Sequence, residues 1–430
     1  MSSHDAAAIA GPWLSRNADG RLLADGLDLE QLAQRFGTPL YLYSRAQIEA
    51  TWEQFRLAIK GHHARVCYAL KANSNLAIVE LMKSLGCGFD IVSGGELERV
   101  VAAGGDPGDV LFSGVGKTVA ELTRALELGV RCFNVESLAE LDRLDEIAGR
   151  VGKRAPVSLR INPDVDAATH PYISTGLKEN KFGIAYGDAA EAYLRAAALP
   201  NLEVVGIDCH IGSQIVEVAP FLAALDRVLA LVDQLARAGI TLRHLDLGGG
   251  LGIRYDDEQP PAPAELMQAL FARIEQWSSG EPPEVLFEFG RALVGNAGVL
   301  LTRVELLKHN GDRRFAVVDA AMNDLLRPSL YQAYHRIEPV QVRDGAGASY
   351  DIVGPVCESG DWLGRDRKLV LAPGDLLAVL SAGAYGMAMS SNYNTRPRAA
   401  EVLIDRGTPV LIRERETVAA LFAGERRLPG

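Results

Sequence analysis

The sequence predicts an α/β protein, in which a (β/α)8 TIM-type barrel is followed by a second, mostly antiparallel β domain. Eight short apolar runs between residues 65 and 288 alternate with helical segments, a pattern typical of βαβ units around a parallel sheet. After about Gly295 the chain changes to short runs rich in β-branched residues between turn residues, which indicates antiparallel strands. The length of 430 residues favours two domains over one hydrophobic core.

The elements are expected in the following order. A strand at 39–43 and a helix at 45–59 precede the barrel. The barrel strands are expected at 65–70, 88–92, 109–112, 131–135, 157–161, 203–210, 243–247 and 285–288. The helices are expected at 76–85, 95–103, 119–128, 138–148, 221–238 and 264–277. The later strands are expected at 299–308, 314–318, 339–342, 350–353, 375–380, 399–404 and 409–412.

These elements predict a barrel domain over residues 36–294. Residues 1–35 together with 295–430 are expected to form the β domain. An open, doubly wound sheet is the alternative, but eight units within roughly 230 residues match a closed barrel better.

The composition excludes several classes of protein. The formal net charge is −11, from 44 Lys and Arg against 55 Asp and Glu, which argues against nonspecific binding to nucleic acid or anionic membranes. The five cysteines are scattered without CxxC spacing, so neither a zinc site nor a disulfide framework is expected. The first residues lack a basic region followed by an apolar core, and no apolar run approaches the ~18 residues of a membrane span. We therefore expect a cytoplasmic protein.

Candidate functional residues lie at the ends of the predicted strands, where barrel enzymes place their active sites. Lys71 follows the first strand, and a lysine that is partly desolvated there can form a Schiff base. Asp90 lies on the second strand, His210 ends the sixth and Glu288 ends the eighth. Taken singly, each residue also fits an ordinary role: a strand-end lysine reaching solvent, a core histidine, or a locally paired glutamate. Their coincidence at one rim favours function.

The glycines that follow the last two strands, in Gly248–Gly252 and at Gly290, expose backbone N–H groups suited to a phosphate, with Ser213 as an additional donor. Glu288 is placed to keep a pyridine nitrogen protonated, and the flat ring of His210 can stack on a cofactor. A Schiff-base lysine with these groups predicts pyridoxal 5'-phosphate (PLP) as cofactor.

With these motifs the chain resembles the fold-type III PLP-dependent decarboxylases, which have the alanine racemase-like fold. The resemblance extends from Phe36 to Asn394. It rests on the motifs Tyr68–Asn73, Phe89–Ser93, His210–Ser213, Gly248–Gly252, Met322–Pro328, Gly354–Asp361 and Ala382–Tyr385.

The resemblance implies a role for each matching residue. Lys71 holds PLP covalently, His210 stacks on the ring, and Cys357 protonates the carbanion left by decarboxylation. The cofactor contacts are Lys71, Asp90, His210, Ser213, Gly249, Glu288, Phe289, Gly290, Arg291 and Tyr385. Cys357 and Glu358 are expected to come from the partner subunit of a homodimer. Phe289 is a departure, since the family usually has proline there.

The substrate prediction depends on arginines. A distal carboxylate calls for a guanidinium, and a distal ammonium calls for a carboxylate. The expected substrate-binding residues are Arg291, Arg327, Tyr331, Glu358 and Tyr385. This set suits meso-2,6-diaminopimelate, which would be converted to L-lysine and CO2 in the last step of lysine biosynthesis.

Other readings stay open on the sequence alone. Arg327 also fits a surface or interdomain salt bridge. The alternatives for the whole protein are a decarboxylase of ornithine, lysine, arginine or a carboxylated polyamine, a PLP-binding protein without decarboxylase activity, and an alanine racemase-like isomerase. The long polar loop at 162–182 fits a lid over the site or an ordinary surface excursion.

Overall fold

The computed structural model describes residues 6–165, 181–278 and 282–429. The possible lid at 162–182 falls largely outside these residues. The chain divides into two compact units. The barrel unit comprises Thr51–Ile253 and Gln259–Ala292, and the β unit comprises Met1–Ala50, Arg254–Glu258 and Leu293–Gly430. Residues 36–50, which the sequence assigns to the barrel domain, are thus grouped with the β unit.

The barrel unit contains the predicted closed barrel of eight parallel strands. The strands are β5 (Ala64–Ala69), β6 (Gly88–Ile91), β7 (Val110–Phe112), β8 (Cys132–Val135), β9 (Ala155–Asn162), β11 (Leu202–Asp208), β12 (His244–Asp246) and β13 (Glu284–Phe287). Each strand pairs in parallel with its neighbour, and β13 pairs with β5 to close the ring. The prediction of a barrel is confirmed, and the open-sheet alternative is wrong. A two-residue strand, β10 (Ile184–Ala185), extends the pairing beside β9.

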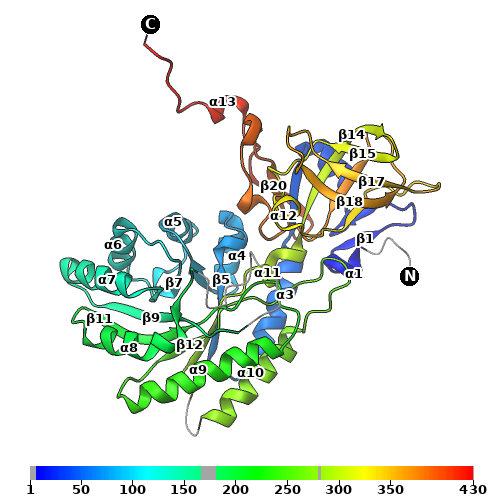
Figure 1. Cartoon of the computed structure of the whole chain (residues 1–430). Coiled ribbons are helices and arrows are strands. Elements are labelled where there is room, and N and C mark those ends of the chain that lie inside the picture. Colours follow the sequence, from blue (N-terminus) through cyan, green and yellow to red (C-terminus); the bar gives the residue numbers. More distant parts are fainter. Residues whose placement is uncertain (1–5, 166–180, 279–281, 430) are drawn as a thin grey trace. The chain divides into compact units, whose positions relative to one another are not determined.

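Helices follow the strands along the chain, as Figure 1 shows. They are α4 (Leu76–Ser84), α5 (Gly94–Ala102), α6 (Val119–Leu128), α7 (Leu138–Val151), α8 (Ala189–Ala198), α9 (Ala219–Arg237) and α10 (Pro263–Trp277). Side-chain hydrogen bonds cap the N-termini of α4, α5, α6 and α7 and fix where these helices begin. Thr118, for example, begins α6 with a capping box that it forms with Glu121. Helix α8 was not expected from the sequence.

The residues inside the barrel are apolar in the middle and polar at the end where the strands lead into the candidate site. A fully buried cluster consists of Cys67, Leu111, Cys132, Val205 and Leu286. All five cysteines of the chain are free thiols, and Cys357 alone among them is exposed. In the described part of the chain, no helix combines the length and the apolar character needed to cross a membrane.

The β unit is built on a second sheet. Its strands are β4 (Leu40–Ser44), β14 (Gly298–Asn310), β15 (Arg313–Val318), β16 (Ile337–Pro339), β17 (Ala348–Val353), β18 (Trp362–Leu369), β19 (Leu376–Val379), β20 (Ala400–Asp405) and β21 (Thr408–Arg413). The pairing is antiparallel except for β15 with β17 and β4 with β20. The prediction of a mostly antiparallel second domain is therefore confirmed.

Two features of this sheet were not expected. Strand β4 forms where the sequence predicts a strand, but it lies between β14 and β20. Strand β18 forms from a mostly polar segment that shows little strand signal. A separate three-stranded sheet lies before β4 in the chain and consists of β1 (Leu14–Arg16), β2 (Leu22–Ala24) and β3 (Leu27–Asp28).

Candidate active site

Lys71 lies in the turn that follows the first barrel strand. Strand β5 leads into a single 3-10 turn, Leu70–Ala72, and the Tyr68 hydroxyl donates to the carbonyl of Asn73 over 2.8 Å, which holds the turn closed. The Lys71 side chain is 35% exposed, and its Nζ lies 3.1 Å from Asp90 Oδ2 on β6. The amine is therefore held by a buried anion and remains accessible for chemistry.

Glu288 lies directly after β13 and is buried. Its Oε1 accepts hydrogen bonds from Ser113 Oγ at 3.3 Å and from Asn134 Nδ2 at 3.4 Å. Burial raises the pKa of Glu288 well above its usual range, and the neighbouring carboxylates of Asp246 and Asp90 raise it further, while Lys71 lowers it. A carboxylate in this environment has a high proton affinity, which suits contact with a pyridine nitrogen that must stay protonated.

His210 follows β11 and is oriented by a backbone group. The Gly249 N–H donates to His210 Nδ1 over 3.2 Å, so in the neutral ring the proton is on Nε2. Burial, with the charges of Lys71 and Arg160, lowers the pKa of His210 well below 6.5. The imidazole is therefore neutral at physiological pH and presents a flat face without charge.

The glycine loop after β12 packs tightly against the end of β13. A Cβ on Gly249 would lie 2.2 Å from the carbonyl oxygen of Glu288, and Gly250 adopts a φ of 106°. The Glu288 N–H also donates to the Gly248 carbonyl over 2.8 Å. Only glycine permits this approach, because any side chain would push the two strand ends apart.

Ser213 and Arg291 form a pair at the same end of the barrel unit. Arg291 Nη2 donates to Ser213 Oγ over 2.9 Å, although the two residues are 78 positions apart in the chain. Gly290 lies beside them, and a Cβ there would lie 2.9 Å from that of Ala72. The last strand end therefore lies directly against the Lys71 turn.

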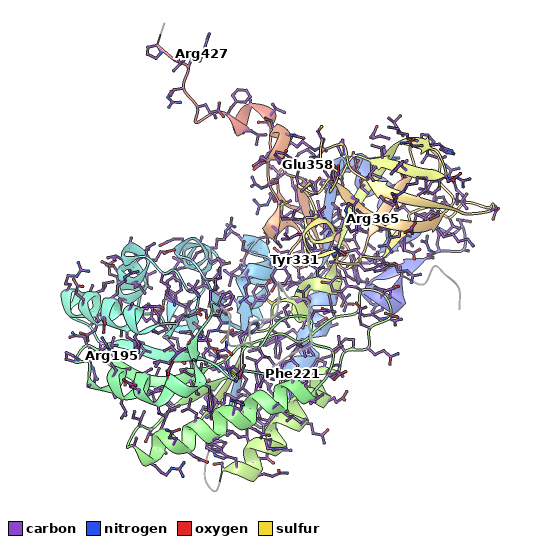
Figure 2. The ribbon with its side chains drawn as sticks, viewed as in Figure 1. Arg195, Phe221, Tyr331, Glu358, Arg365 and Arg427 are labelled. Carbon is purple, nitrogen blue, oxygen red and sulfur yellow. The ribbon has the colours of Figure 1, made fainter. Side chains whose placement is uncertain are left out.

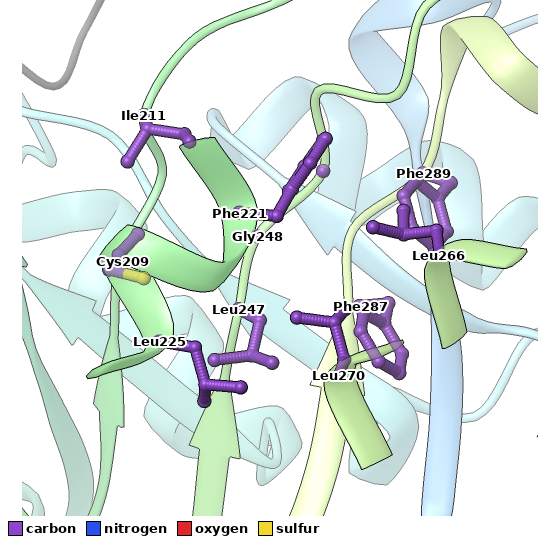
Figure 3. Close-up of a pocket in the computed structure, with 12 residues that line it drawn as sticks. Cys209, Ile211, Phe221, Leu225, Leu247, Gly248, Leu266, Leu270, Phe287 and Phe289 are labelled. Carbon is purple, nitrogen blue, oxygen red and sulfur yellow. The ribbon is translucent and has the colours of Figure 1, made fainter. Parts of the chain in front are cut away.

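Phe289, which stands where the family usually has proline, packs its ring into the core of the barrel unit. Its ring centroid lies 4.8 Å from that of Phe55 and 5.6 Å from that of Phe287. The ring also lines an apolar cavity of about 10 Å³ between α9, α10 and the ends of β12 and β13 (Figure 3), a volume that suits about one water molecule. The backbone carbonyl of Phe289 accepts from the Ala69 N–H over 3.3 Å. The position therefore supports the site through packing and backbone bonding.

Two buried acids beside Glu288, Asp208 and Asp246, were not predicted from the sequence. Asp208 ends β11 and Asp246 ends β12, and carboxylate oxygens of these two residues and Glu288 lie within 4.8 Å of one another. Arg160 on β9 lies 4.0 Å from Asp208 and donates to Glu136 over 3.0 Å. The signal that could have identified them is a polar residue at the carboxyl end of a barrel strand.

Arg327 belongs to the β unit, at the start of α12 (Arg327–Tyr331). It is 5% exposed. Its Nη1 lies 2.7 Å from His335 Nε2, and its guanidinium lies 4.7 Å from the centroid of the Tyr255 ring. His335 Nδ1 lies 2.9 Å from the Leu380 carbonyl, so the ring donates there and accepts from Arg327. A buried guanidinium oriented in this way differs from the surface salt bridge that the sequence left open.

Cys357 and Glu358 lie on an exposed loop of the β unit, and Figure 2 labels Glu358 and Tyr331. Tyr393 donates from its hydroxyl to Glu358 Oε1 over 2.8 Å. The loop is held by the buried Asp361, whose carboxylate accepts from the N–H groups of Val356 and Met322 at 2.6 Å. The Asp361 side chain therefore joins the two motifs that carry Cys357 and Arg327, a role that was not predicted from the sequence.

Tyr385, the last predicted residue, also lies in the β unit. It adopts a φ of 56°, a backbone conformation that is uncommon for a residue with a side chain and often marks a functional position. Tyr331 is half-buried at the end of α12.

The predicted residues thus fall into two groups. The barrel unit carries one group at a single end of the barrel: Lys71, Asp90, His210, Ser213, Gly249, Glu288, Phe289, Gly290 and Arg291. The β unit carries the other: Arg327, Tyr331, Cys357, Glu358 and Tyr385.

The residues of the barrel unit fit the predicted cofactor. Asp90 Oδ1 and Asp246 Oδ2 are buried oxygens for which no donor is found among the residues that the structure describes. Together with Glu288 they make this end of the barrel strongly acidic, as a protonated ring nitrogen requires. Lys71 supplies the amine, and the Ser213–Arg291 pair supplies donors for a phosphate.

Comparison with known proteins supports the same chemistry. A family model described as "Pyridoxal-dependent decarboxylase, pyridoxal binding domain" matches residues 45–295. The diaminopimelate decarboxylase of Pseudomonas aeruginosa is 60% identical over 411 residues, which cover 96% of this chain and 98% of the relative. The chain belongs to the diaminopimelate decarboxylase family.

Further diaminopimelate decarboxylases agree with this assignment. That of Vibrio cholerae is 58% identical over 417 residues, covering 97% of this chain and 99% of the relative. The solved structure of the diaminopimelate decarboxylase from "m. jannaschii", in co-complex with L-lysine, has a TM-score of 0.93 and 40% identity to this chain. The match covers 98% of this chain and 99% of that chain. The resemblance inferred from the sequence motifs is therefore confirmed, as is the alanine racemase-like fold class.

Proposed function

We propose that this diaminopimelate decarboxylase binds PLP and removes one carboxylate of meso-2,6-diaminopimelate to give L-lysine and CO2, the last step of lysine biosynthesis. The observation that carries the proposal is the combination of Lys71, His210 and Glu288 at one end of the barrel in a chain 60% identical to a diaminopimelate decarboxylase. The runner-up is a decarboxylase of another amino acid, such as ornithine, lysine or arginine.

The residues of the barrel unit hold and tune the cofactor. PLP, when bound, supplies an electron sink for the carbanion that the loss of CO2 leaves. Lys71 would hold the cofactor through its amine, and the neutral imidazole of His210 would offer an uncharged face to its ring. Glu288 would hold a proton at the ring nitrogen. Ser213, Gly249, Gly290 and Arg291 would hold the phosphate, with Asp90 fixing the position of Lys71.

The residues of the β unit select the substrate and move a proton. Arg327 binds the distal carboxylate with its guanidinium, assisted by Tyr331 and Tyr385. Glu358 receives the distal ammonium. The exposed thiol of Cys357 donates the proton that replaces CO2. We propose that Cys357 and Glu358 act in the active site of the partner subunit of a homodimer, and that the protein works in the cytoplasm.

An end-point assay with a substrate panel tests the proposal. The PLP-loaded protein is incubated separately with meso-diaminopimelate, L-lysine, L-ornithine and L-arginine, and both CO2 and the amine product are measured. L-Lysine formed from meso-diaminopimelate alone is the expected result. Release of CO2 from another amino acid alone would retain the fold and the role of Lys71 but overturn the assignment of Arg291, Arg327 and Glu358 as substrate-binding residues.

A variant pair tests the role of Lys71 itself. Lys71→Ala is expected to abolish turnover, because the chain loses its nucleophilic amine. Lys83→Ala, which removes an exposed lysine at the end of α4, is the matched control and should retain normal turnover. Substantial activity in Lys71→Ala contradicts the scheme.

A further inference from the structure

Three carboxyl groups meet where adjacent barrel strands end. Asp208 ends β11, Asp246 ends β12 and Glu288 follows β13, and their oxygens lie within 4.8 Å of one another. Their exposed fractions are 1%, 0% and 6%. Three negative charges this close and this deeply buried would repel strongly, so the group must carry protons or a counterion.

Some oxygens of the carboxyl cluster formed by Asp208, Asp246 and Glu288 accept hydrogen bonds, and others have no donor among the residues that the structure describes. Asp246 Oδ1 accepts from the Gly248 N–H over 2.9 Å, and Glu288 Oε1 accepts from Ser113 and Asn134. Within the part of the chain that the structure describes, Asp246 Oδ2 and Asp208 Oδ1 have no donor. A proton shared between neighbouring carboxylates supplies the missing donor.

The cations nearby do not neutralise the cluster. Lys71 lies 3.1 Å from Asp90, and Arg160 lies 3.0 Å from Glu136 and only 4.0 Å from Asp208. The charged and titratable groups that interact with the cluster from the surrounding elements are Lys71, Asp90, Glu136, Arg160, Tyr193 and the thiols of Cys67, Cys132 and Cys209. The cations are thus balanced by other acids, and protons are left to balance Asp246 and Glu288.

The titration behaviour agrees with this geometry. Burial raises the pKa of Asp208 and of Glu288 well above the usual range, and the charge of Asp246 is the largest neighbouring contribution in both cases. Burial also raises the pKa of Asp246 to about 7, while the Gly248 N–H lowers it. Asp246 is therefore the member that ionises most readily, and its charge increases the proton affinity of Glu288.

We propose that Asp246, supported by Asp208, is a positioning residue that shares a proton with Glu288 and so keeps the cofactor nitrogen protonated over a wider pH range than Glu288 alone. The proposal rests on PLP binding as proposed above. Asp246 acts through Glu288 and is not itself a catalytic residue. Asp208 contributes less, because Arg160 partly balances its charge.

The test compares two ligands that differ only at the ring nitrogen. The cofactor-free full chain is titrated with PLP and with the analogue that has carbon in place of that nitrogen, at pH 7 and pH 9. The measured quantity is the ratio of the two dissociation constants. Asp246→Asn keeps the shape of the side chain, an acceptor for the Gly248 N–H and a donor for Glu288, and removes only the charge.

In the wild-type protein a preference for PLP at both pH values is expected. In Asp246→Asn the preference should fall about tenfold at pH 9, the ratio that one pKa unit represents, while binding of the carbon analogue stays unchanged. Asp208→Asn should show a smaller fall, and Glu288→Gln should lose the preference. Glu284→Gln is the matched control, since Glu284 begins β13 at its opposite end, where it pairs with Arg131.

An unchanged ratio in Asp246→Asn would overturn the proposal, as would a metal ion bound to the cluster in protein purified without chelators. Failure of the proposed function is distinguishable, because a wild-type protein that binds neither ligand contradicts PLP binding itself. In that case infrared spectroscopy of the cofactor-free protein still measures the protonation of the three carboxyl groups. A carboxylic acid C=O band at neutral pH that Asp246→Asn alters supports proton sharing, and its absence overturns the proposal.

Discussion

Lys71 Nζ lies 3.1 Å from Asp90 Oδ2, and the Asp90 side chain is fully buried. The strands that carry these residues are adjacent, with Ala69 opposite Asp90 in the register of β5 and β6. The pairing orients the lysine amine through a charge-assisted hydrogen bond, which is stronger than a neutral one.

Asp90→Asn should therefore weaken the hydrogen bond that holds Lys71 without removing it. Replacing the carboxylate by a neutral amide oxygen as the acceptor costs about 1 kcal/mol, or roughly fivefold in rate. The turnover number and the absorbance of bound PLP measure the effect. Asp142→Asn, on an exposed pair with Arg195, is the control, and equal rates for the two variants would contradict the role of Asp90.

Arg327→Lys should raise KM for meso-diaminopimelate. Lysine keeps the charge but loses the planar fork that His335 and Tyr255 hold in place, at a cost of about 2 kcal/mol, or roughly thirtyfold in affinity. Steady-state kinetics separates KM from the turnover number. Arg365→Ala removes an exposed arginine of the same unit and should leave KM unchanged, and an equally unchanged KM in Arg327→Lys would reject the substrate role.

A Lys71 variant and a Cys357 variant should restore each other's activity when they are co-expressed, because each active site is proposed to take Lys71 from one subunit and Cys357 from the other. Lys71→Ala and Cys357→Ala are each expected to be inactive alone. Co-expressed, they form mixed dimers that contain one intact site, so about a quarter of all sites recover activity. Lys71→Ala co-expressed with His210→Ala is the control, because both changes affect the same barrel unit and no intact site can form. The absence of recovery with Cys357→Ala would mean that each site is built from one chain.

Asp246→Asn should change how stability depends on pH. The pKa of Asp246 is raised to about 7 by burial, so the folded state binds this proton more tightly than the unfolded state. The stabilisation of the folded state by this proton is fully present below about pH 4, the pKa of an aspartate in the unfolded chain. It is lost as the pH rises through the folded-state pKa of about 7.

The variant has no such proton, so its stability relative to the wild type should increase by about 2 kcal/mol between pH 5 and pH 7. Urea unfolding at the two pH values measures the difference. Asp142→Asn shows the effect of removing an exposed carboxylate. A difference between Asp246→Asn and wild type that does not vary with pH would show that Asp246 titrates in the folded state as it does in the unfolded chain.

Phe289→Ala should destabilise the barrel unit. Its buried ring contacts Phe55 and Phe287 and lines an existing cavity, so truncation should cost about 3–5 kcal/mol. Thermal or urea unfolding measures the loss. Leu57→Ala, at a residue that is 54% exposed, should shift stability by less than about 0.5 kcal/mol, and a similarly small shift in Phe289→Ala would show that the core relaxes around the missing ring.

The sequence by itself determined the barrel, the second β domain, the family and the candidate residues Lys71, Asp90, His210 and Glu288. Strand and helix periodicity is a local property, and the ends of parallel strands are marked by the residues that follow each apolar run. For the same reason the polar strand β18 was missed, since its local pattern is weak. Helix α8 was missed although its alanine-rich sequence favours a helix.

Only the tertiary structure decided which residues meet. Strand β4 joins the sheet of the β unit, and Asp361 accepts from the N–H of Met322, which lies 39 positions earlier in the chain. Asp208 and Asp246 approach Glu288 because the barrel closes with a definite register, in which Asp208 is opposite Asp246 and Asp246 is opposite Leu286. Such pairing depends on contacts between distant segments, which no local pattern encodes. Burial then sets the protonation of these acids, because the cost of a buried charge depends on all the groups around it.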